Sequence, residues 1–233
     1  MFVTGTSTEV GKTVVAAAIA HTLAAEGKTV AVFKPAVTGL NPEQPADGPK
    51  SGPVVRISAR RREGEADHAL LRRAAGSSQS DEEIAPYRYG PPASPHLAAA
   101  LAGEEIDPER LRAAAATAAR DADVLVCEGV GGLLVPLRED YLVRDLAVDL
   151  GLPLVVAASP GLGTINHTLL TVEAAHTAGL IVELVVLTPW PEPPSEIERS
   201  NRETIEALSG IRVATLPRID LDDPSGWPKL ALS

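Results

Sequence analysis

Cysteine is almost absent from this sequence, and its few histidines are scattered. Cys127 is the one cysteine among 233 residues, so no disulfide can form within the chain. The five histidines do not show the Cys/His spacing of a zinc site. These absences exclude a disulfide-stapled secreted fold and predict a protein of the reducing cytoplasm. Hydrophobic residues make up 45% of the chain, which is enough for a buried core.

Excess positive charge and long apolar runs are also missing. The formal net charge is −10, which argues against nonspecific binding to nucleic acid. No apolar run reaches the ~18–20 residues of a membrane span. Met1 leads almost directly into a strand-like run, so no signal peptide is visible. We therefore predict neither a nucleic-acid partner nor a membrane association.

What is present is an alternation of short apolar runs with alanine-rich helical stretches. Strands that are apolar throughout and separated by helices favour a parallel sheet covered on both faces. Strands are predicted at residues 2–4, 28–35, 123–129, 152–159, 179–188 and 212–217. Helices are predicted at residues 12–27, 164–179 and 194–210. Without an internal repeat or a second domain, the expected fold is one α/β domain over residues 1–233.

Two segments do not follow this alternation. Residues 41–65, dominated by proline, glycine and charge, are predicted to form a long, mobile insertion loop. The three consecutive arginines at 60–62 could meet a phosphate, but a solvated surface is the better interpretation of such a charge run. Residues 87–96, YRYGPPASPH, are predicted to form a second, stiffer loop.

The segment GTSTEVGKT nearly matches a phosphate-binding P-loop. The usual spacing is Gly, four residues and then Gly-Lys-Ser/Thr, but here five residues separate Gly5 from Gly11. The context is right, because a predicted strand precedes the segment and a predicted helix follows it. Backbone N–H groups of such a loop and the start of the helix bind phosphate.

The side chains of this loop suggest its chemistry. Lys12 would reach the β- and γ-phosphates of a nucleotide, and the Thr13 hydroxyl would bind Mg²⁺. The additional residue between the glycines widens the loop. Thr8 and Glu9 are therefore candidates for facing a substrate as well as the nucleotide.

Two more charged residues are expected at the same place. Glu128, in VLVCEGVGG, is predicted to end an apolar strand, and Lys34, in KPAVTG, to end another. Ligands of open α/β sheets bind beyond the carboxyl ends of the strands. Glu128 is placed to hold Mg²⁺ directly or through water, although it could instead cap a turn. Lysines and carboxylates around one phosphate site suit phosphoryl transfer, in which charge stabilisation dominates.

Several motifs together resemble one enzyme family. GTSTEVGKT, KPAVTG, SPH, CEGVGGLLVPL and GLGTINHTLLTVEAA occur in the order and roughly the spacing of dethiobiotin synthetase. The resemblance covers nearly the whole chain apart from residues 41–65. It implies a fold similar to the MinD/ParA-type P-loop proteins. It also implies a homodimer with the active site at the subunit interface.

The resemblance further implies the reaction, a ring closure by a ligase that forms carbon–nitrogen bonds. In this family 7,8-diaminopelargonic acid reacts with CO₂ or bicarbonate to give a carbamate. ATP phosphorylates the carbamate, and the second amine closes the ureido ring of dethiobiotin, with ADP and phosphate released. This is a step of biotin synthesis. Positioning of the carbamate against the γ-phosphate carries much of the catalysis.

The family's functional residues are carried over position by position. The resemblance implies catalytic roles for Lys12, Lys34 and Thr8. The implied nucleotide-binding residues are Glu9, Val10, Gly11, Lys12, Thr13, Val14, Glu128, Pro189 and Pro217. The implied substrate-binding residues are Thr8, Lys34, Thr38, Gly131, Gly132, Gly163, Thr164 and Asn166. The implied Mg²⁺ ligands are Thr13, Glu128 and Asp67, with Asp47 as the alternative to Asp67.

The start of the predicted helix at 164–179 has two interpretations. In the family, this helix start receives the substrate carboxylate from the other subunit, and an anion at a helix N-terminus is physically reasonable. Alternatively, Asn166 only caps its own helix.

The sequence departs from the family at two places. The family often carries Asn-Asp after the fifth strand, where the asparagine amide reads the adenine edge, but here the run is TPWPEPP. Pro189 has neither a side-chain amide nor a backbone N–H. We expect weak or altered base selectivity, so that CTP or other triphosphates serve; Trp190 could face a base or simply pack. Asn201 replaces a tyrosine that some members direct to the substrate.

Three other functions are weaker matches. A MinD/ParA-type switch ATPase usually has a second lysine just after the first loop glycine, where this chain has Thr6. A cobyrinic-acid amide synthase needs a glutaminase domain with a reactive cysteine, and the chain has no room for one. Cys127 lies inside a predicted strand and is expected to pack there. An uncharacterised P-loop hydrolase is the remaining alternative.

Overall fold

The computed structural model describes residues 1–40 and 66–232. The predicted loop at 41–65, which includes Asp47 and the arginines at 60–62, lies outside the described residues. No helix in the described ranges is both long and apolar enough to cross a membrane.

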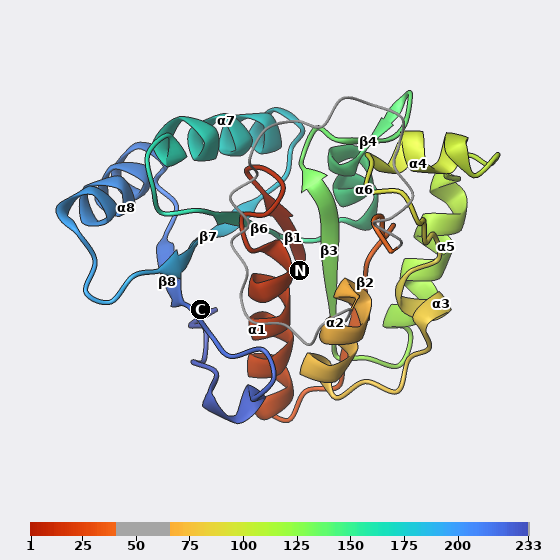
Figure 1. The fold of residues 1–233 in the computed structure, drawn as a ribbon, viewed down its shortest axis with the longest axis horizontal. Helices are drawn as coiled ribbons and strands as arrows, with labels where there is room; N and C mark the ends of the chain where they lie inside the picture. The colour runs from red at the N-terminus through yellow and green to blue at the C-terminus, as the bar shows by residue number, and fades with distance from the viewer. Residues whose placement is uncertain (41–65, 233) are drawn as a thin grey trace.

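A six-stranded sheet forms the centre of the molecule, in the order β2-β3-β1-β6-β7-β8 (Figure 1). Every neighbouring pair in this sheet is parallel. The strands are β1 (Phe2–Gly5), β2 (Val30–Phe33), β3 (Val124–Gly132), β6 (Leu154–Ala158), β7 (Val182–Trp190) and β8 (Val213–Pro217). A separate antiparallel pair is formed by β4 (Pro136–Arg138) and β5 (Tyr141–Leu142).

The sheet order places β1 at a topological switch point. From β1 the chain builds β2 and β3 on one side, and β6, β7 and β8 on the other. Ligands of open α/β sheets bind where the strand order reverses. The loop that follows β1 therefore lies where a bound ligand is expected.

Helices cover both faces of the sheet. One apolar cluster joins the sheet to α1 (Lys12–Ala25), α2 (Asp67–Ala75), α3 (Asp81–Ile84) and the segment after η1 (Pro224–Gly226). The opposite cluster contains α4 (Pro95–Leu101), α5 (Pro108–Ala119), α6 (Val143–Leu150), α7 (Thr164–Thr177) and α8 (Glu196–Ser209). Because side chains alternate along a strand, neighbours such as Phe2 and Val3 belong to opposite clusters.

The predicted strands and helices are all present, with ends shifted by three residues at most. Two expectations need correction. Glu128 does not end its strand, because β3 continues to Gly132, which pairs with Gly5 of β1. The stiff loop at 87–96 ends earlier than predicted, since α4 begins at Pro95, and proline is favoured in the first turn of a helix.

Candidate active site

The loop between β1 and α1 packs closely against the end of β7. Gly11 is the N-cap of α1 and has a left-handed φ of 88°. A Cβ atom on Gly11 would lie 2.6 Å from Thr188 Cγ2, so a side chain there would clash with β7. This glycine is therefore required both by its backbone conformation and by the close approach.

Two residues of this loop, Lys12 and Glu9, have distinctive positions. Lys12, the first residue of α1, is 8% exposed, and its Nζ donates to the Ser7 carbonyl oxygen at 2.8 Å. The ammonium group is thus folded over the loop that would hold phosphate. Glu9 has a left-handed φ of 58°, which is uncommon for a non-glycine residue and marks a strained position beside the site.

Four residues from different elements meet next to this loop. Lys34 follows β2, and its Nζ lies 2.9 Å from Asp67 Oδ2 and 2.7 Å from Glu128 Oε1. Thr13 Oγ1 donates to the same Glu128 oxygen at 2.8 Å. The structure therefore brings together Thr13, Lys34, Asp67 and Glu128, the last three by way of the Lys34 ammonium.

Burial and charge set the ionisation of this cluster. Burial lowers the pKa of Lys12 to about 8, although the Glu128 carboxylate opposes the shift. Burial alone would also lower the pKa of Lys34, but the carboxylates of Asp67 and Glu128 raise it above its ordinary value. Burial raises the pKa of the Glu128 carboxyl, so this group depends on a nearby cation to stay ionised.

The oxygen atoms of this cluster fit Mg²⁺, which prefers oxygen ligands. Glu128 Oε2 is buried and has no hydrogen-bond partner in the described structure, so one carboxylate oxygen is left for a cation. The described residues contain no group of three or more His, Cys, Asp and Glu side chains that could hold a metal alone. One hydroxyl and two carboxylates suit a metal that is also held by phosphate oxygens.

A groove of about 440 Å³ lies beside the loop that joins β1 to α1, between β3 and α7. Thr8 and Gly132, both predicted substrate contacts, line it together with Leu134 and Leu170. His167 lines it too, although sequence reasoning did not select this residue. Its place next to Asn166, in the helix-start motif GLGTINH, is a pattern that could have identified it.

The start of α7 lacks the side-chain cap that one interpretation of Asn166 predicted. Gly163 is the N-cap, and no side chain caps this helix, so the alternative that Asn166 caps its own helix is wrong. Thr164 is 3% exposed, its Oγ1 lies 3.4 Å from Thr168 Oγ1, and its N–H donates to Gly161. Asn166 is exposed.

Asn201 has a structural contact that the sequence did not reveal. This residue of α8 is 8% exposed, and its Nδ2 donates to the carbonyl oxygens of Pro160 and Gly161 at 2.9 and 3.2 Å. Its amide therefore holds the loop that leads into α7.

The predicted base-binding residues gather at the ends of the last two strands. Thr188, which contacts Gly11, directly precedes Pro189 in β7, and Trp190 pairs with Pro217 of β8. Pro189 thus directly follows the residue that contacts the P-loop, and Pro217 lies at the end of the neighbouring strand.

The remaining predicted residues support the loop and its surroundings. Val10 is buried in the core, so it could contact a nucleotide only through its backbone, and Val14 is half-buried on α1. Thr38 is half-buried after β2, and Gly131 is buried in β3. Cys127 is fully buried, and burial raises the pKa of its thiol, which fits the expected packing role.

A glycine-bearing loop after a central parallel strand, with its lysine and hydroxyl at the start of the next helix, defines a P-loop NTPase. The profile of the AAA domain family matches residues 1–225. The chain is 44% identical to the ATP-dependent dethiobiotin synthetase of Anaeromyxobacter dehalogenans over 219 residues, which cover 93% of this chain and 89% of that protein.

Two further relatives carry the same name. Identity is 39% over 215 residues to the Bacillus cereus protein, covering 92% of this chain and 81% of the relative. Identity is 34% over 212 residues to the Bacillus subtilis (strain 168) protein, covering 91% and 84%. The chain belongs to the ATP-dependent dethiobiotin synthetase family, whose members are ligases. These relatives do not favour the alternative of a partner-binding switch ATPase.

Proposed function

We propose that this protein converts 7,8-diaminopelargonic acid, CO₂ and a nucleoside triphosphate into dethiobiotin, nucleoside diphosphate and phosphate. The observation that carries the proposal is the position of Lys34. Its ammonium joins Asp67 and Glu128 beside the P-loop and comes from the same segment as Thr38. The Lys34 ammonium group is thus within reach of both the phosphate side and the proposed substrate side of the site.

The reaction proceeds through three bond-forming steps. One amine of the diamine attacks CO₂ and loses a proton, which gives a carbamate. A carbamate oxygen attacks the γ-phosphorus, and the bond to the nucleoside diphosphate breaks. The second amine then attacks the carbamoyl carbon, loses its proton and expels inorganic phosphate. Each step needs its partners in line, so positioning supplies much of the rate.

The lysines are proposed to stabilise the charge that moves during phosphoryl transfer. Lys12 would leave the Ser7 carbonyl for the β- and γ-phosphates, and Lys34 would face the carbamate and the γ-phosphate. Glu9, Val10, Gly11 and Val14 would complete the phosphate side. Thr8, Thr38, Gly131 and Gly132 would line the diamine.

Thr13, Asp67 and Glu128 are the residues proposed to hold Mg²⁺. When bound, Mg²⁺ supplies positive charge to the phosphate oxygens of the triphosphate. The buried, unpaired Glu128 Oε2 supports this assignment.

We also propose a homodimer that completes the substrate site. Leu162 is 98% exposed, Leu170 56% and Leu134 54%, although large apolar side chains usually avoid water. Leu134 and Leu170 line the groove beside Thr8. A second copy that covers them would bring the first turn of its α7, with Gly163, Thr164 and Asn166, to the substrate carboxylate.

The buried free thiol of Cys127 is consistent with a cytoplasmic location.

Phosphate release tests the proposed function. The protein is supplied with Mg²⁺, bicarbonate and a triphosphate, with and without the diamine, and phosphate is measured continuously. We expect release to depend on the diamine and on bicarbonate. Equal release without the diamine would overturn the proposal and leave an uncharacterised hydrolase.

A further inference from the structure

The segment that carries Lys34 and Thr38 is held by a second segment from elsewhere in the chain. We call residues 34–40 the rim segment and residues 84–91 the support segment. Lys34 N donates to Ile84 O at 2.8 Å, and Val37 N donates to Tyr87 O at 2.9 Å. The backbone of the rim segment is therefore fixed on both sides of its substrate-facing residues.

Three more backbone hydrogen bonds complete this pairing. Tyr89 N donates to Val37 O at 2.8 Å, and Leu40 N donates to Tyr89 O at 3.2 Å. Gly39 N donates to Pro91 O at 3.0 Å. Thr38 itself lies between two bonded neighbours, so a displacement of the support segment would displace Thr38 and Lys34 with it.

Tyr87 anchors the support segment to α5. Its side chain is buried, and its hydroxyl oxygen accepts a hydrogen bond from the backbone N–H of Asp107 at 2.9 Å. Asp107 is the N-cap of α5. The tyrosine thus connects the rim of the active site to the start of a helix that supplies no predicted site residue.

Arg110 makes the second link between α5 and the support segment. Its guanidinium carbon lies 4.6 Å from the centroid of the Tyr87 ring, and its Nη2 donates to Pro86 O at 3.1 Å. A cation over an aromatic face is attracted by the negative face of the ring, so this contact favours the observed position of Tyr87.

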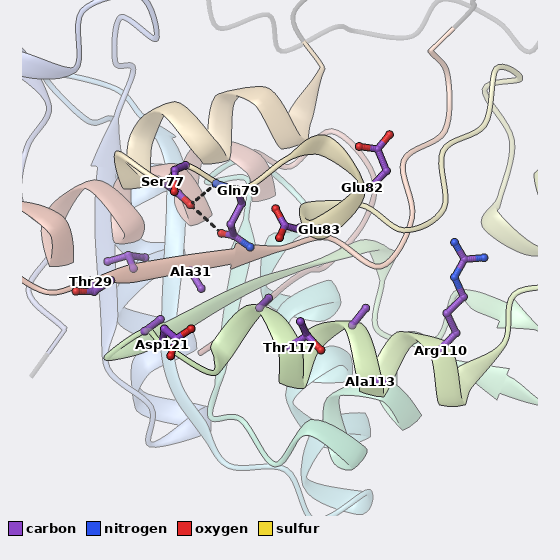
Figure 2. A pocket seen from close by; sticks show the side chains of 15 residues that line it. Thr29, Ala31, Ser77, Gln79, Glu82, Glu83, Arg110, Ala113, Thr117 and Asp121 are labelled. Carbon is purple, nitrogen blue, oxygen red and sulfur yellow. Dashed lines mark hydrogen bonds between the residues drawn. The ribbon is translucent and has the colours of Figure 1, made fainter.

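These contacts stand at the edge of a cavity. A cavity of about 590 Å³ lies between the edge strand β2 and α5, and Arg110 is among the residues that line it. Figure 2 shows Arg110 extending from α5 at one end of this cavity, apart from Ser77 and Gln79. Arg110 and Tyr87 therefore link α5 to the support segment at one end of this cavity.

We propose that Tyr87 and Arg110 are positioning residues for the diamine side of the reaction. They hold the support segment, which holds the rim segment and so places Lys34 and Thr38. The P-loop meets this chain of contacts through Glu128, which pairs with Lys34 and accepts a hydrogen bond from Thr13. The inference rests on the proposed function, because it assigns the rim segment to the diamine.

Three variants test the two links. Tyr87→Phe keeps the ring and removes the hydroxyl acceptor of the Asp107 N–H. Arg110→Met removes the cation and the donor to Pro86, and Arg110→Lys restores the cation. Arg112→Met is the matched control, since Arg112 lies on the same helix and pairs instead with Asp149 at 2.8 Å.

The measurement is KM for the diamine and KM for the nucleotide, each at saturating concentration of the other substrate. For Tyr87→Phe and Arg110→Met we expect the diamine KM to rise about three- to tenfold, as for the loss of one hydrogen bond. The nucleotide KM should change less than the diamine KM, because Thr38 is assigned to the diamine alone. Arg110→Lys should recover part of the loss. Arg112→Met should change neither KM.

A purely structural role would give a different result. Equal changes of both KM values in Tyr87→Phe and Arg110→Met would overturn the positioning role. KM values of these variants that match those of Arg112→Met would overturn it too. If the unaltered protein releases no diamine-dependent phosphate, the proposed function fails and this inference fails with it. If the unaltered protein does so and Tyr87→Phe matches it, only the positioning role fails.

Discussion

At the scale of single residues, the site depends on two buried lysines whose pKa values are shifted in opposite directions. Lys12 has a lowered pKa because it is buried, whereas Lys34 has a raised pKa because two carboxylates surround it. Lys12 is therefore the cation that can lose its charge near neutral pH. The raised pKa of Lys34 favours its charged form, and its ammonium opposes the rise that burial causes in the pKa of Glu128.

Lys12→Ala should reduce turnover by at least about 100-fold, because a charge that faces the transferring phosphoryl group is lost. The measurement is diamine-dependent phosphate release at saturating substrates. Lys28→Ala is the control, since Lys28 is exposed after the end of α1. Near-normal turnover of Lys12→Ala would contradict the assigned role.

Nucleotide binding should weaken as the pH rises. The pKa of Lys12 is about 8 in the free protein, so its ammonium is present below that pH and is lost above it. Since only the charged form attracts phosphate, the nucleotide Kd should rise between about pH 7 and about pH 9. Calorimetric titration measures this, and a Kd that stays flat over the range would refute the prediction.

Gly11→Ala should weaken nucleotide binding by at least about tenfold, because the new Cβ would push the P-loop away from Thr188. Gly27→Ala is the matched control variant for Gly11→Ala. Gly27 also has a positive φ, of 83°, but has no atom within 4 Å of the Cβ position. Gly27→Ala should lose about 1–2 kcal/mol of folding stability, because alanine disfavours the left-handed backbone, but it should bind nucleotide normally.

A second substitution makes this test sharper. Thr188→Ser removes the methyl group that the new Cβ would meet, so it should restore part of the binding to Gly11→Ala. If Gly11→Ala and Gly27→Ala bind nucleotide equally well, the close approach to β7 has no role in the site.

At the scale of secondary-structure elements, the end of β7 sets the base side of the site. Thr188 contacts Gly11, and the next residue, Pro189, cannot donate a hydrogen bond from its backbone. We predict that CTP or another triphosphate supports turnover at a rate comparable with ATP. A panel of nucleotides at equal concentration measures this, and a strict preference for ATP would overturn the prediction.

The elements that could be predicted from sequence are those with a regular pattern. Apolar runs such as the one before Glu128 indicate buried parallel strands, and the alanine-rich run after Lys12 indicates a helix. The rule that ligands bind beyond strand ends also led to the expectation that Lys34 and Glu128 lie around the same site.

The features that could not be predicted depend on contacts that leave no periodic pattern in the sequence. The pairing of Val37 with Tyr87 and Tyr89 uses backbone groups, which any residue supplies, and joins segments distant in the chain. The contact from Asn201 to Pro160 likewise depends on how α8 packs beside α7. The extension of β3 beyond Glu128 was missed because glycines usually indicate a loop.

At the scale of the whole molecule, the proposed dimer makes the active site a shared one. In each site the P-loop would come from one subunit and the start of α7 from the other. Three exposed apolar residues support such an interface: Leu134 and Leu170, which line the groove, and Leu162, which precedes α7.

Mixing two inactive variants tests this sharing. A Lys12→Ala subunit lacks the P-loop lysine, and an Asn166→Ala subunit lacks the side chain at the start of α7. After exchange, half of the dimers should be mixed, and each should hold one intact site, so about a quarter of the normal activity should return. The mass in solution should be twice the 24.3 kDa of the chain. No recovery from a dimeric mixture would contradict shared sites.

The most direct measurement follows the carbon atom that closes the ring. The protein is incubated with ¹³C-bicarbonate, the diamine, Mg²⁺ and a triphosphate, and the product is analysed by ¹³C NMR together with the release of phosphate. We predict one labelled ureido carbon for each phosphate released. Phosphate release without label in a ureido product would contradict the proposed reaction.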